Sequence, residues 1–196
     1  MEWRFTIPPE TSEPPMARGG VWVFAYGALM WEPGFAHQEC IPARLFGYHR
    51  AMCIYSIRAR GTKEVPGLVH GLDRGGSCVG RAYRVNREDW RAVREYLYDR
   101  EMVTNVYVPC FRNIVLEDGG RVPAYCFLAR RDHEQYTGRL SDERMVELLL
   151  QGHGERGPAI DYLANTVENL DELGIRDGVL HRILGKAKAA QSAIDS

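Results

Sequence analysis

The chain has 196 residues, of which 45% are hydrophobic, and its formal net charge at pH 7 is -1. Acidic and basic residues are interspersed without a basic block, which excludes the electrostatic footprint of a nucleic-acid-binding protein. No apolar run approaches the roughly 20 residues that span a bilayer. We therefore expect one globular domain with neither nucleic-acid nor membrane partners.

The first residues are rich in proline and lack the apolar core of a signal peptide. We expect an extended, flexible arm over residues 1–19, a main domain over 20–185 and a C-terminal tail over 186–196. An odd number of cysteines, with no C-x-x-C pair, argues for buried thiols in a reducing compartment. We expect a cytoplasmic protein with free cysteines at Cys40, Cys53, Cys78, Cys110 and Cys126.

Four apolar segments in the first half are typical of strands. They are Val21–Tyr26, Arg44–Ser56, Leu68–Leu72 and Cys78–Val85. The first is continuously apolar, which indicates a strand buried on both faces. Gly47 is expected to bend the second strand, and residues 73–76 (DRGG) are expected to form a turn between the last two.

A helix is predicted next, followed by a hairpin. Trp90, Val93 and Leu97 recur at spacings of three and four, with Asn86 as a candidate N-cap. This helix is expected to end at Glu101. Two further strands, Val106–Leu116 and Val122–Ala129, are predicted to pair around the turn at residues 117–120.

The last third of the chain carries helix signals. Ser141 is a candidate N-cap, Pro158 stands where a first helical residue is favoured, and Gly174 is a candidate C′ residue. A final helix is expected from about Asp177. Strands with one helix among them, followed by helices, predict an α+β fold.

Several common catalytic signatures are missing. The glycine-rich stretch at residues 71–80 has no Lys-Ser/Thr ending, so a turn between strands is favoured over a phosphate loop. The histidines never occur as H-x-x-x-H, so we expect no metal site. His153 lies between two glycines, and a surface or packing role is favoured for it.

Two groups of residues remain as candidates for chemistry. The loop Tyr26–Trp31 follows a buried strand, and its small residues let backbone N–H groups approach a carboxylate or an oxyanion. An ordinary tight turn with its aromatic side chains in the core is the alternative.

The second candidate is Glu101, at the C-terminal end of a predicted helix and close to Asp99. Both the helix dipole and the neighbouring carboxylate oppose its ionisation, which suits a group that accepts and returns a proton near neutral pH. The alternative is a solvated surface charge paired with Arg100.

Taken together, these segments resemble the ChaC family of γ-glutamylcyclotransferases, whose usual N-terminal pattern is W-V-F-G-Y-G-S-L-x-W. The resemblance covers roughly residues 20–180, in the family's order. The segments that carry it are Val21–Trp31 (VWVFAYGALMW), Arg60–Gly67 (RGTKEVPG), Gly80–Val85 (GRAYRV), Glu95–Glu101 (EYLYDRE), Val103–Tyr107 (VTNVY) and Gly152–Thr166 (GHGERGPAIDYLANT).

The resemblance implies a small mixed β-barrel with flanking helices and a helical C-terminal third. It also implies conversion of glutathione into 5-oxoproline and cysteinylglycine, with neither a metal nor an organic cofactor. Glu101 is the implied proton-transfer residue. The implied substrate-binding residues are Tyr26, Gly27, Ala28, Leu29, Tyr107 and Tyr162.

The chain departs from the family pattern at several positions. Ala28 replaces the usual serine, Ala59 stands where many relatives carry histidine, and the connection after Glu101 is longer than in animal relatives. These departures bear on substrate preference more than on reaction type. Two alternatives therefore stay open: a cyclotransferase for other γ-glutamyl amino acids or amines, and a non-catalytic barrel that binds a γ-glutamyl metabolite.

Overall fold

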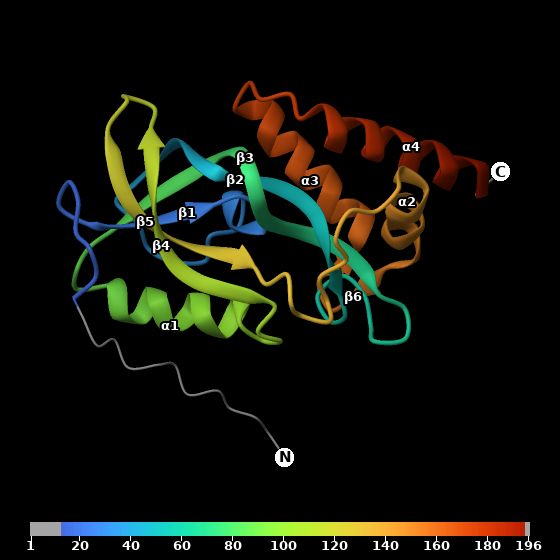
Figure 1. Cartoon of the computed structure of the whole chain (residues 1–196), viewed down its shortest axis with the longest axis horizontal. Coiled ribbons are helices and arrows are strands. Elements are labelled where there is room, and N and C mark those ends of the chain that lie inside the picture. The colour runs from blue at the N-terminus through green and yellow to red at the C-terminus, as the bar shows by residue number, and fades with distance from the viewer. Residues whose placement is uncertain (1–12, 195–196) are drawn as a thin grey trace, which may run out of the picture.

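The computed structural model describes residues 13–194 and is built around a closed barrel of five strands. The order around the barrel is β1-β3-β2-β4-β5, and a parallel pairing between β1 and β5 closes it, whereas the other neighbours in this order are antiparallel (Figure 1). This confirms the predicted small mixed β-barrel. The strands are β1 (Val21–Ala25), β2 (Glu39–Ser56), β3 (Gly67–Val85), β4 (Tyr107–Leu116) and β5 (Arg121–Ala129).

The prediction of two strands with a turn between them was wrong for residues 68–85. This segment is one long strand, β3, that pairs with β2 along nearly its whole length. Gly75 and Gly76 have φ values of +100° and +67°, and they lie opposite Gly47, whose φ is +83°. Because both strands carry glycine at the same level, the two bend together instead of reversing direction.

Four α-helices surround the barrel. Figure 1 shows α1 along one side of the barrel and α2, α3 and α4 gathered at the other. Their bounds are α1 (Trp90–Glu101), α2 (Asp142–Gln151), α3 (Ala159–Glu172) and α4 (Gly178–Ile194); short elements are the 3₁₀ helix η1 (Ala28–Met30) and the strands β6 (His153–Gly154) and β7 (Gly157–Pro158). Among residues 13–194, no helix combines the length and the apolar character needed to cross a bilayer.

Local capping signals were accurate with one exception. Ser141 caps α2 by accepting a hydrogen bond from the Arg144 amide, and Gly174 follows α3 with φ of +68°. Asn86 does not cap α1, because residues 87–89 form an intervening turn and the helix starts only at Trp90. Asp177 caps α4 through its carboxylate, which accepts from the amides of Val179 and Leu180 at 3.2 Å.

The two ends of the chain are described only in part. Residues 1–12 of the predicted arm lie outside the described residues. Within the rest of that arm, Ala17 and Gly20 pair through their backbones, and the Trp22 indole donates to the Ala17 carbonyl at 2.9 Å. Helix α4 runs through the predicted start of the tail at residue 186, and Ala187 is fully buried.

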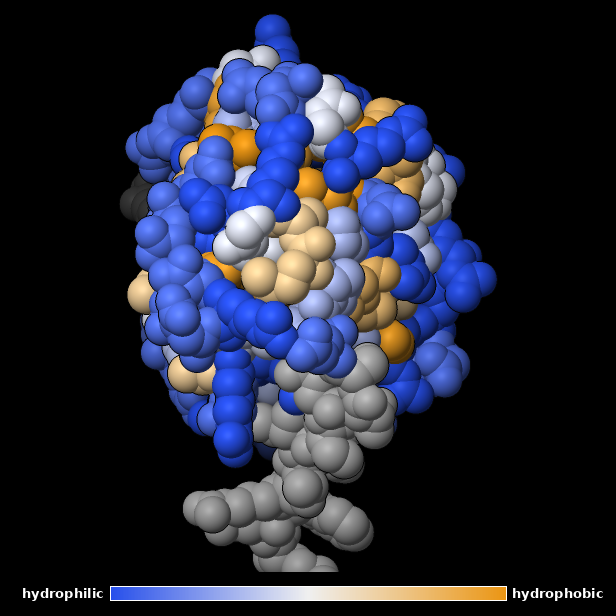
Figure 2. Space-filling model, turned by 90° about the vertical axis from the view of Figure 1, so that its left-hand side faces the viewer, coloured by the Kyte–Doolittle hydropathy of each residue, from blue (hydrophilic) through white to orange (hydrophobic). Residues whose placement is uncertain are grey.

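The core of the described residues has three clusters, and the two larger ones meet at β1. Trp22 and Phe24 point into the barrel, whereas Val21 and Val23 point outward to the cluster under the helices. Because alternate residues of a strand face opposite sides, a strand covered on both sides must be apolar throughout. On the face drawn in Figure 2, hydrophilic side chains surround small, separate groups of apolar ones.

The cysteines lie in or against this core. Cys53, Cys78 and Cys126 are buried, Cys40 and Cys110 are partly buried, and all five are free thiols. The expected free thiols are confirmed for all five cysteines, and the expected burial is confirmed for Cys53, Cys78 and Cys126.

Candidate active site

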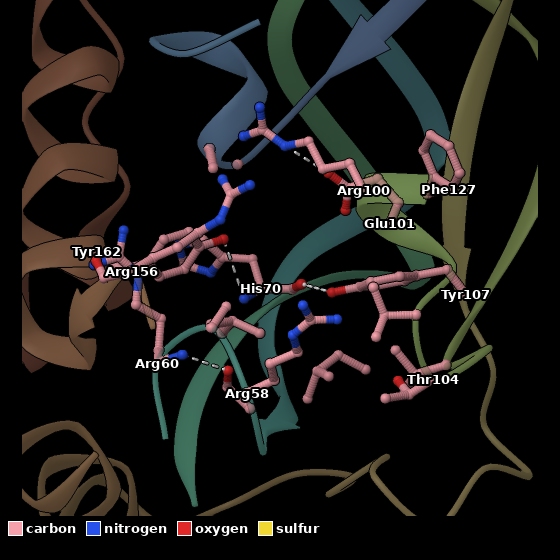
Figure 3. Close-up of a pocket in the computed structure, with 18 of the residues that line it drawn as sticks. Arg58, Arg60, His70, Arg100, Glu101, Thr104, Tyr107, Phe127, Arg156 and Tyr162 are labelled. Atoms are coloured by element: carbon pink, nitrogen blue, oxygen red, sulfur yellow. Dashed lines mark hydrogen bonds and ion pairs between the residues drawn. The ribbon is translucent and has the colours of Figure 1, made fainter. Parts of the chain in front are cut away.

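A pocket of about 270 Å³ opens between η1, the end of α1, the barrel and α3. All seven site residues predicted from the sequence line this pocket, although they come from widely separated parts of the chain: Tyr26, Gly27, Ala28, Leu29, Glu101, Tyr107 and Tyr162. Figure 3 shows Glu101, Tyr107 and Tyr162 around one cavity, with His70 between the two tyrosines. The tertiary fold therefore brings the predicted residues together.

The loop after β1 is held tightly at Gly27. A Cβ atom at this position would lie 2.7 Å from the Tyr162 hydroxyl, so a larger residue would require the Tyr162 side chain to move. The internal bonds of η1 begin with the Met30 amide, which donates to the Gly27 carbonyl at 2.8 Å. Because the first N–H groups of a helical turn have no partner within it, the amides before Met30 are oriented to bind an external acceptor.

A buried arginine fixes the position of this loop from behind. Arg50 donates through Nε to the Tyr26 carbonyl at 2.5 Å and through Nη2 to the Val79 carbonyl at 2.7 Å. Tyr26 is anchored at its other end, where its hydroxyl donates to the Phe127 carbonyl at 2.9 Å. Arg50 of β2 thus links the loop to β3, and the Tyr26 side chain links it to β5.

Glu101 is the last residue of α1, and its carboxylate is directed into the pocket (Figure 3). The side chain is only 22% exposed, and its Oε1 lies 3.3 Å from Arg100 Nε. Burial raises the pKa of Glu101 above its ordinary value, while Arg100 and Arg156 oppose that shift. The pKa direction predicted from the sequence is confirmed, but its cause is desolvation and not the neighbouring Asp99.

Arg100 itself is immobilised. Its side chain is 5% exposed, and its Nη1 donates to the Glu32 carbonyl at 2.7 Å and to the Tyr96 hydroxyl at 2.8 Å. The alternative of a solvated surface pair between Arg100 and Glu101 is therefore excluded: the pair exists, but it is buried at the wall of the pocket.

The backbone of one residue, His70, anchors both pocket tyrosines. Tyr107 donates from its hydroxyl to the His70 carbonyl at 2.9 Å, and the Tyr162 hydroxyl accepts from the His70 amide at 3.4 Å. Burial raises the pKa of both phenols, so they stay protonated at neutral pH. Because Tyr162 accepts from His70, its own proton is left to donate towards the pocket.

The pocket concentrates buried polar atoms that lack hydrogen-bond partners. Among the described residues four such side-chain atoms occur, and three of them belong to pocket residues: His70 Nδ1, Arg100 Nη2 and Gln135 Oε1. Most buried polar groups in proteins are paired, since leaving one unpaired is costly. Their gathering at one place indicates a site that binds a polar ligand.

The rim of the pocket was not predicted from the sequence. Residues 57–60 join the β6–β7 hairpin through two backbone bonds, from the Glu155 amide to the Arg58 carbonyl and from the Arg156 amide to the Ala59 carbonyl, both at 2.9 Å. This contact places the side chains of Arg58, Arg60 and Arg156 at the pocket. Neither spacing nor periodicity relates Arg58 and Arg60 to Arg156, which lies about a hundred residues further along the chain.

Comparison with known proteins agrees with this geometry. The model of the family described as ChaC-like protein matches residues 21–190. A glutathione-specific γ-glutamylcyclotransferase of Escherichia coli strain K12 is 34% identical over 170 residues, which cover 87% of this chain and 74% of that protein. The Schizosaccharomyces pombe protein of the same name is 28% identical and covers 83% of this chain and 89% of its own length.

The fold is also found among solved structures. A crystal structure of a yeast γ-glutamyl cyclotransferase specific to glutathione superposes with a TM-score of 0.80 at 21% identity, covering 87% of this chain and 96% of the yeast chain. At this identity the likeness establishes a common fold.

Proposed function

Because the chain belongs to the ChaC-like family, we propose that it is a γ-glutamylcyclotransferase that converts glutathione into 5-oxoproline and cysteinylglycine. The observation that carries this proposal is the carboxylate of Glu101, which is largely buried and directed into the pocket that the loop Tyr26–Leu29 also lines. A proton-transfer group and a set of backbone donors thus face the same cavity.

The reaction needs no second reactant. The α-amine of the γ-glutamyl group attacks its own γ-carbonyl, a C–N bond closes a five-membered lactam, and the amide C–N bond to cysteine breaks. Well-oriented intramolecular attacks reach effective molarities of roughly 10⁵ M or more. The protein therefore contributes by holding the substrate in a folded conformation and by moving protons.

Glu101 supplies the proton transfer. Its carboxylate takes a proton from the attacking ammonium and returns it to the departing amine of cysteine, so the enzyme is unchanged at the end. The raised pKa suits both steps, and such a group contributes about 10²–10⁴-fold in rate. Arg100 and Arg156 oppose the rise in the pKa of Glu101 because their positive charges favour the ionised carboxylate.

The loop supplies the binding of negative charge. Backbone amides of Gly27, Ala28 and Leu29 bind the α-carboxylate or the oxyanion that develops on the γ-carbonyl. Ala28 lacks the usual hydroxyl but keeps its amide, so this part of the site does not depend on serine. Tyr162, a neutral phenol next to Gly27, is a further donor.

The alternatives differ in what they require of the site. A non-catalytic binding barrel has no use for a proton-transfer group, and the direction of the Glu101 carboxylate into the pocket argues against it. A cyclotransferase for other γ-glutamyl compounds keeps the same chemistry and changes only the leaving group. The five free thiols fit a cytoplasmic location, where glutathione is abundant and reduced.

The test is release of 5-oxoproline from glutathione, measured beside γ-glutamylalanine with the same purified protein. We expect 5-oxoproline from glutathione, and less from γ-glutamylalanine. Release from γ-glutamylalanine alone would move the substrate to γ-glutamyl amino acids, and release from neither would contradict the proposed function.

A further inference from the structure

Two polar groups that the proposed reaction does not use lie at the end of the pocket formed by residues 55–58. One is the side-chain oxygen of Gln135, and the other is the guanidinium of Arg58. In Figure 3, Arg58 lies across the cavity from Glu101, with His70 and Tyr107 between them. This end of the pocket is therefore separate from the groups assigned to proton transfer and to the binding loop.

Gln135 is buried, and only one of its two side-chain polar atoms has a hydrogen-bond partner. Its Nε2 donates to the Tyr55 carbonyl at 2.7 Å, and its backbone carbonyl accepts from the Tyr55 amide at 2.8 Å. Because a carbonyl can only accept, the bond to Tyr55 fixes which end of the amide is the nitrogen. The other end, Oε1, is a buried acceptor without a partner in a residue that lines the pocket. An N–H group of a ligand would satisfy it.

Arg58 is held by only part of its guanidinium. Its Nε donates to Glu155 Oε2 at 2.8 Å, and its side chain is 57% exposed. A guanidinium has a fork of donors that can bind a carboxylate through two nitrogens. Since Glu155 occupies Nε, the two Nη groups can bind a second anion, and Figure 3 shows the side chain extending towards Thr104 and Tyr107.

The other arginines of the pocket are engaged elsewhere. Arg60 donates to the carbonyls of Arg156 and Pro158 and stacks over the Tyr162 ring at 5.6 Å. Arg100 is bound at Glu101 and Glu32. Arg156 forms an ion pair through Nη1 with Glu32 Oε2 at 3.5 Å. Arg58 is thus the cation positioned for the far end of a substrate.

We propose that Arg58 and Gln135 form a subsite for the leaving dipeptide, in which Arg58 binds the C-terminal carboxylate and Gln135 Oε1 accepts from the peptide N–H between cysteine and glycine. This inference rests on the proposed function. It makes the substrate class a γ-glutamyl tripeptide with a free carboxyl terminus, and it disfavours γ-glutamyl amines, which have neither the second peptide N–H nor the carboxylate.

The length of glutathione sets how far the subsite can lie from the reacting centre. Two residues separate the γ-carbonyl carbon from the terminal carboxylate, a span of at most about 7 Å in an extended chain. With the γ-glutamyl group at the loop and Glu101, the proposal directs the dipeptide across the cavity towards Arg58. The peptide N–H lies within the same residue as the carboxylate, so both groups arrive at one end of the pocket.

The test compares glutathione with its glycinamide form, in which the terminal carboxylate is a neutral amide. Both release 5-oxoproline, so one assay gives kcat/KM for each. We expect the wild-type protein to prefer the free acid about 10-fold, at the lower end for a charge-assisted hydrogen bond because Arg58 is more than half exposed. In Arg58→Gln the preference should fall to within about 2-fold, mainly through KM, with turnover of the amide unchanged.

Glu155→Gln is the matched control. It removes the ion pair with Arg58 but keeps the guanidinium, so the preference for the free acid should persist. A purely structural role of the Arg58–Glu155 pair would instead lower turnover of both substrates equally in both variants, and that result would overturn the subsite.

Gln135 is tested with a glutathione analogue whose glycine nitrogen carries a methyl group. The wild-type protein should turn it over more slowly than glutathione, and Gln135→Met should narrow the difference. Equal turnover of glutathione and both analogues by the wild-type protein would overturn the subsite while leaving the cyclotransferase in place. No 5-oxoproline from any of the three would overturn both proposals.

Discussion

The pocket and the layer formed by α2, α3 and α4 differ in whether their polar groups have partners. In the pocket, polar atoms of His70 and Gln135 are buried without a partner. In the helical layer, most buried side chains are apolar, as at Leu148 and Ile183, and the buried polar Thr166 and Asn169 each donate a hydrogen bond to a backbone carbonyl. Several of its charges lie at the surface in ion pairs, for example Asp142 with Arg182 at 2.9 Å and with Lys186 at 2.8 Å.

The difference separates the sources of stability from the sources of function. An unpaired buried polar group costs about 1–3 kcal/mol, so a fold retains it only where something else benefits. Burying apolar side chains instead makes the free energy of folding more favourable, and it stabilises the helical layer. Substitutions in the pocket should therefore change activity at nearly constant stability, and substitutions in the helical layer should do the reverse.

The largest expected effect is that of Glu101→Gln. The amide keeps the shape of the side chain but cannot accept the proton, so release of 5-oxoproline should fall about 10²–10⁴-fold. Because a buried carboxylate with a raised pKa is an unfavourable charge in the folded state, its neutralisation should leave Tm nearly unchanged or slightly higher. Full activity in this variant would contradict the role of Glu101. A large fall in Tm would contradict the expectation that pocket substitutions leave stability nearly constant.

The matching change in the helical layer is Ile183→Ala. Ile183 is fully buried in α4, and truncation of such a side chain leaves a cavity that costs about 2–5 kcal/mol. Unfolding in urea measures this loss as a lower midpoint. The activity of the remaining folded protein should equal that of the wild type; a specific loss of activity per folded molecule would show that the layer takes part in catalysis.

A smaller effect is expected for Arg156→Gln, and it concerns pH. The Arg156 guanidinium favours the ionised form of Glu101, so its removal should raise the pKa of that carboxyl further. Activity requires the carboxylate and is lost as pH falls through this pKa. The acid limb of the kcat/KM profile should therefore move to higher pH. An unchanged profile would show that Arg156 does not influence the pKa of Glu101.

The smallest effect is expected for Asp142→Asn. Arg182 and Lys186 hold the pKa of Asp142 well below its ordinary value, so this carboxylate contributes stability above the unfolded-state pKa and loses it as pH falls. The pairing is at the surface and is screened by salt. We expect a small fall in Tm at low salt that fades as salt is added, with unchanged activity; a fall that persists in high salt would argue against an ionic cause.

Much of the fold could be predicted from patterns within a few residues. The apolar run Val21–Tyr26 indicated a strand covered on both faces, and β1 has this environment. Ser141 and Gly174 marked helix ends correctly because capping is a local interaction. Residues 73–76 were misinterpreted because their turn composition is also compatible with a bend, and only pairing with β2 decides between the two.

Only part of the candidate site could be predicted from the sequence. Glu101 and the loop Tyr26–Leu29 were found because each lies in a recognisable motif, and the fold places them around one pocket. Arg58 and Gln135 lie outside the segments that carry the resemblance, and Arg156 lies inside one of them without an implied role; each reaches the pocket through contacts between distant loops. Their assigned roles, like those of the motif residues, are predictions that the experiments above test.

By itself, the sequence determined the kinds of elements, most of their boundaries and the residues of the core, because hydrophobic periodicity and capping act over a few residues. Only the tertiary structure decided that β3 is continuous and that the Glu101 carboxylate is buried. It also decided that unpaired polar groups meet in one cavity. Desolvation and strand pairing depend on neighbours far away in the chain, and so they arise only when the barrel has closed and the helices have packed against it.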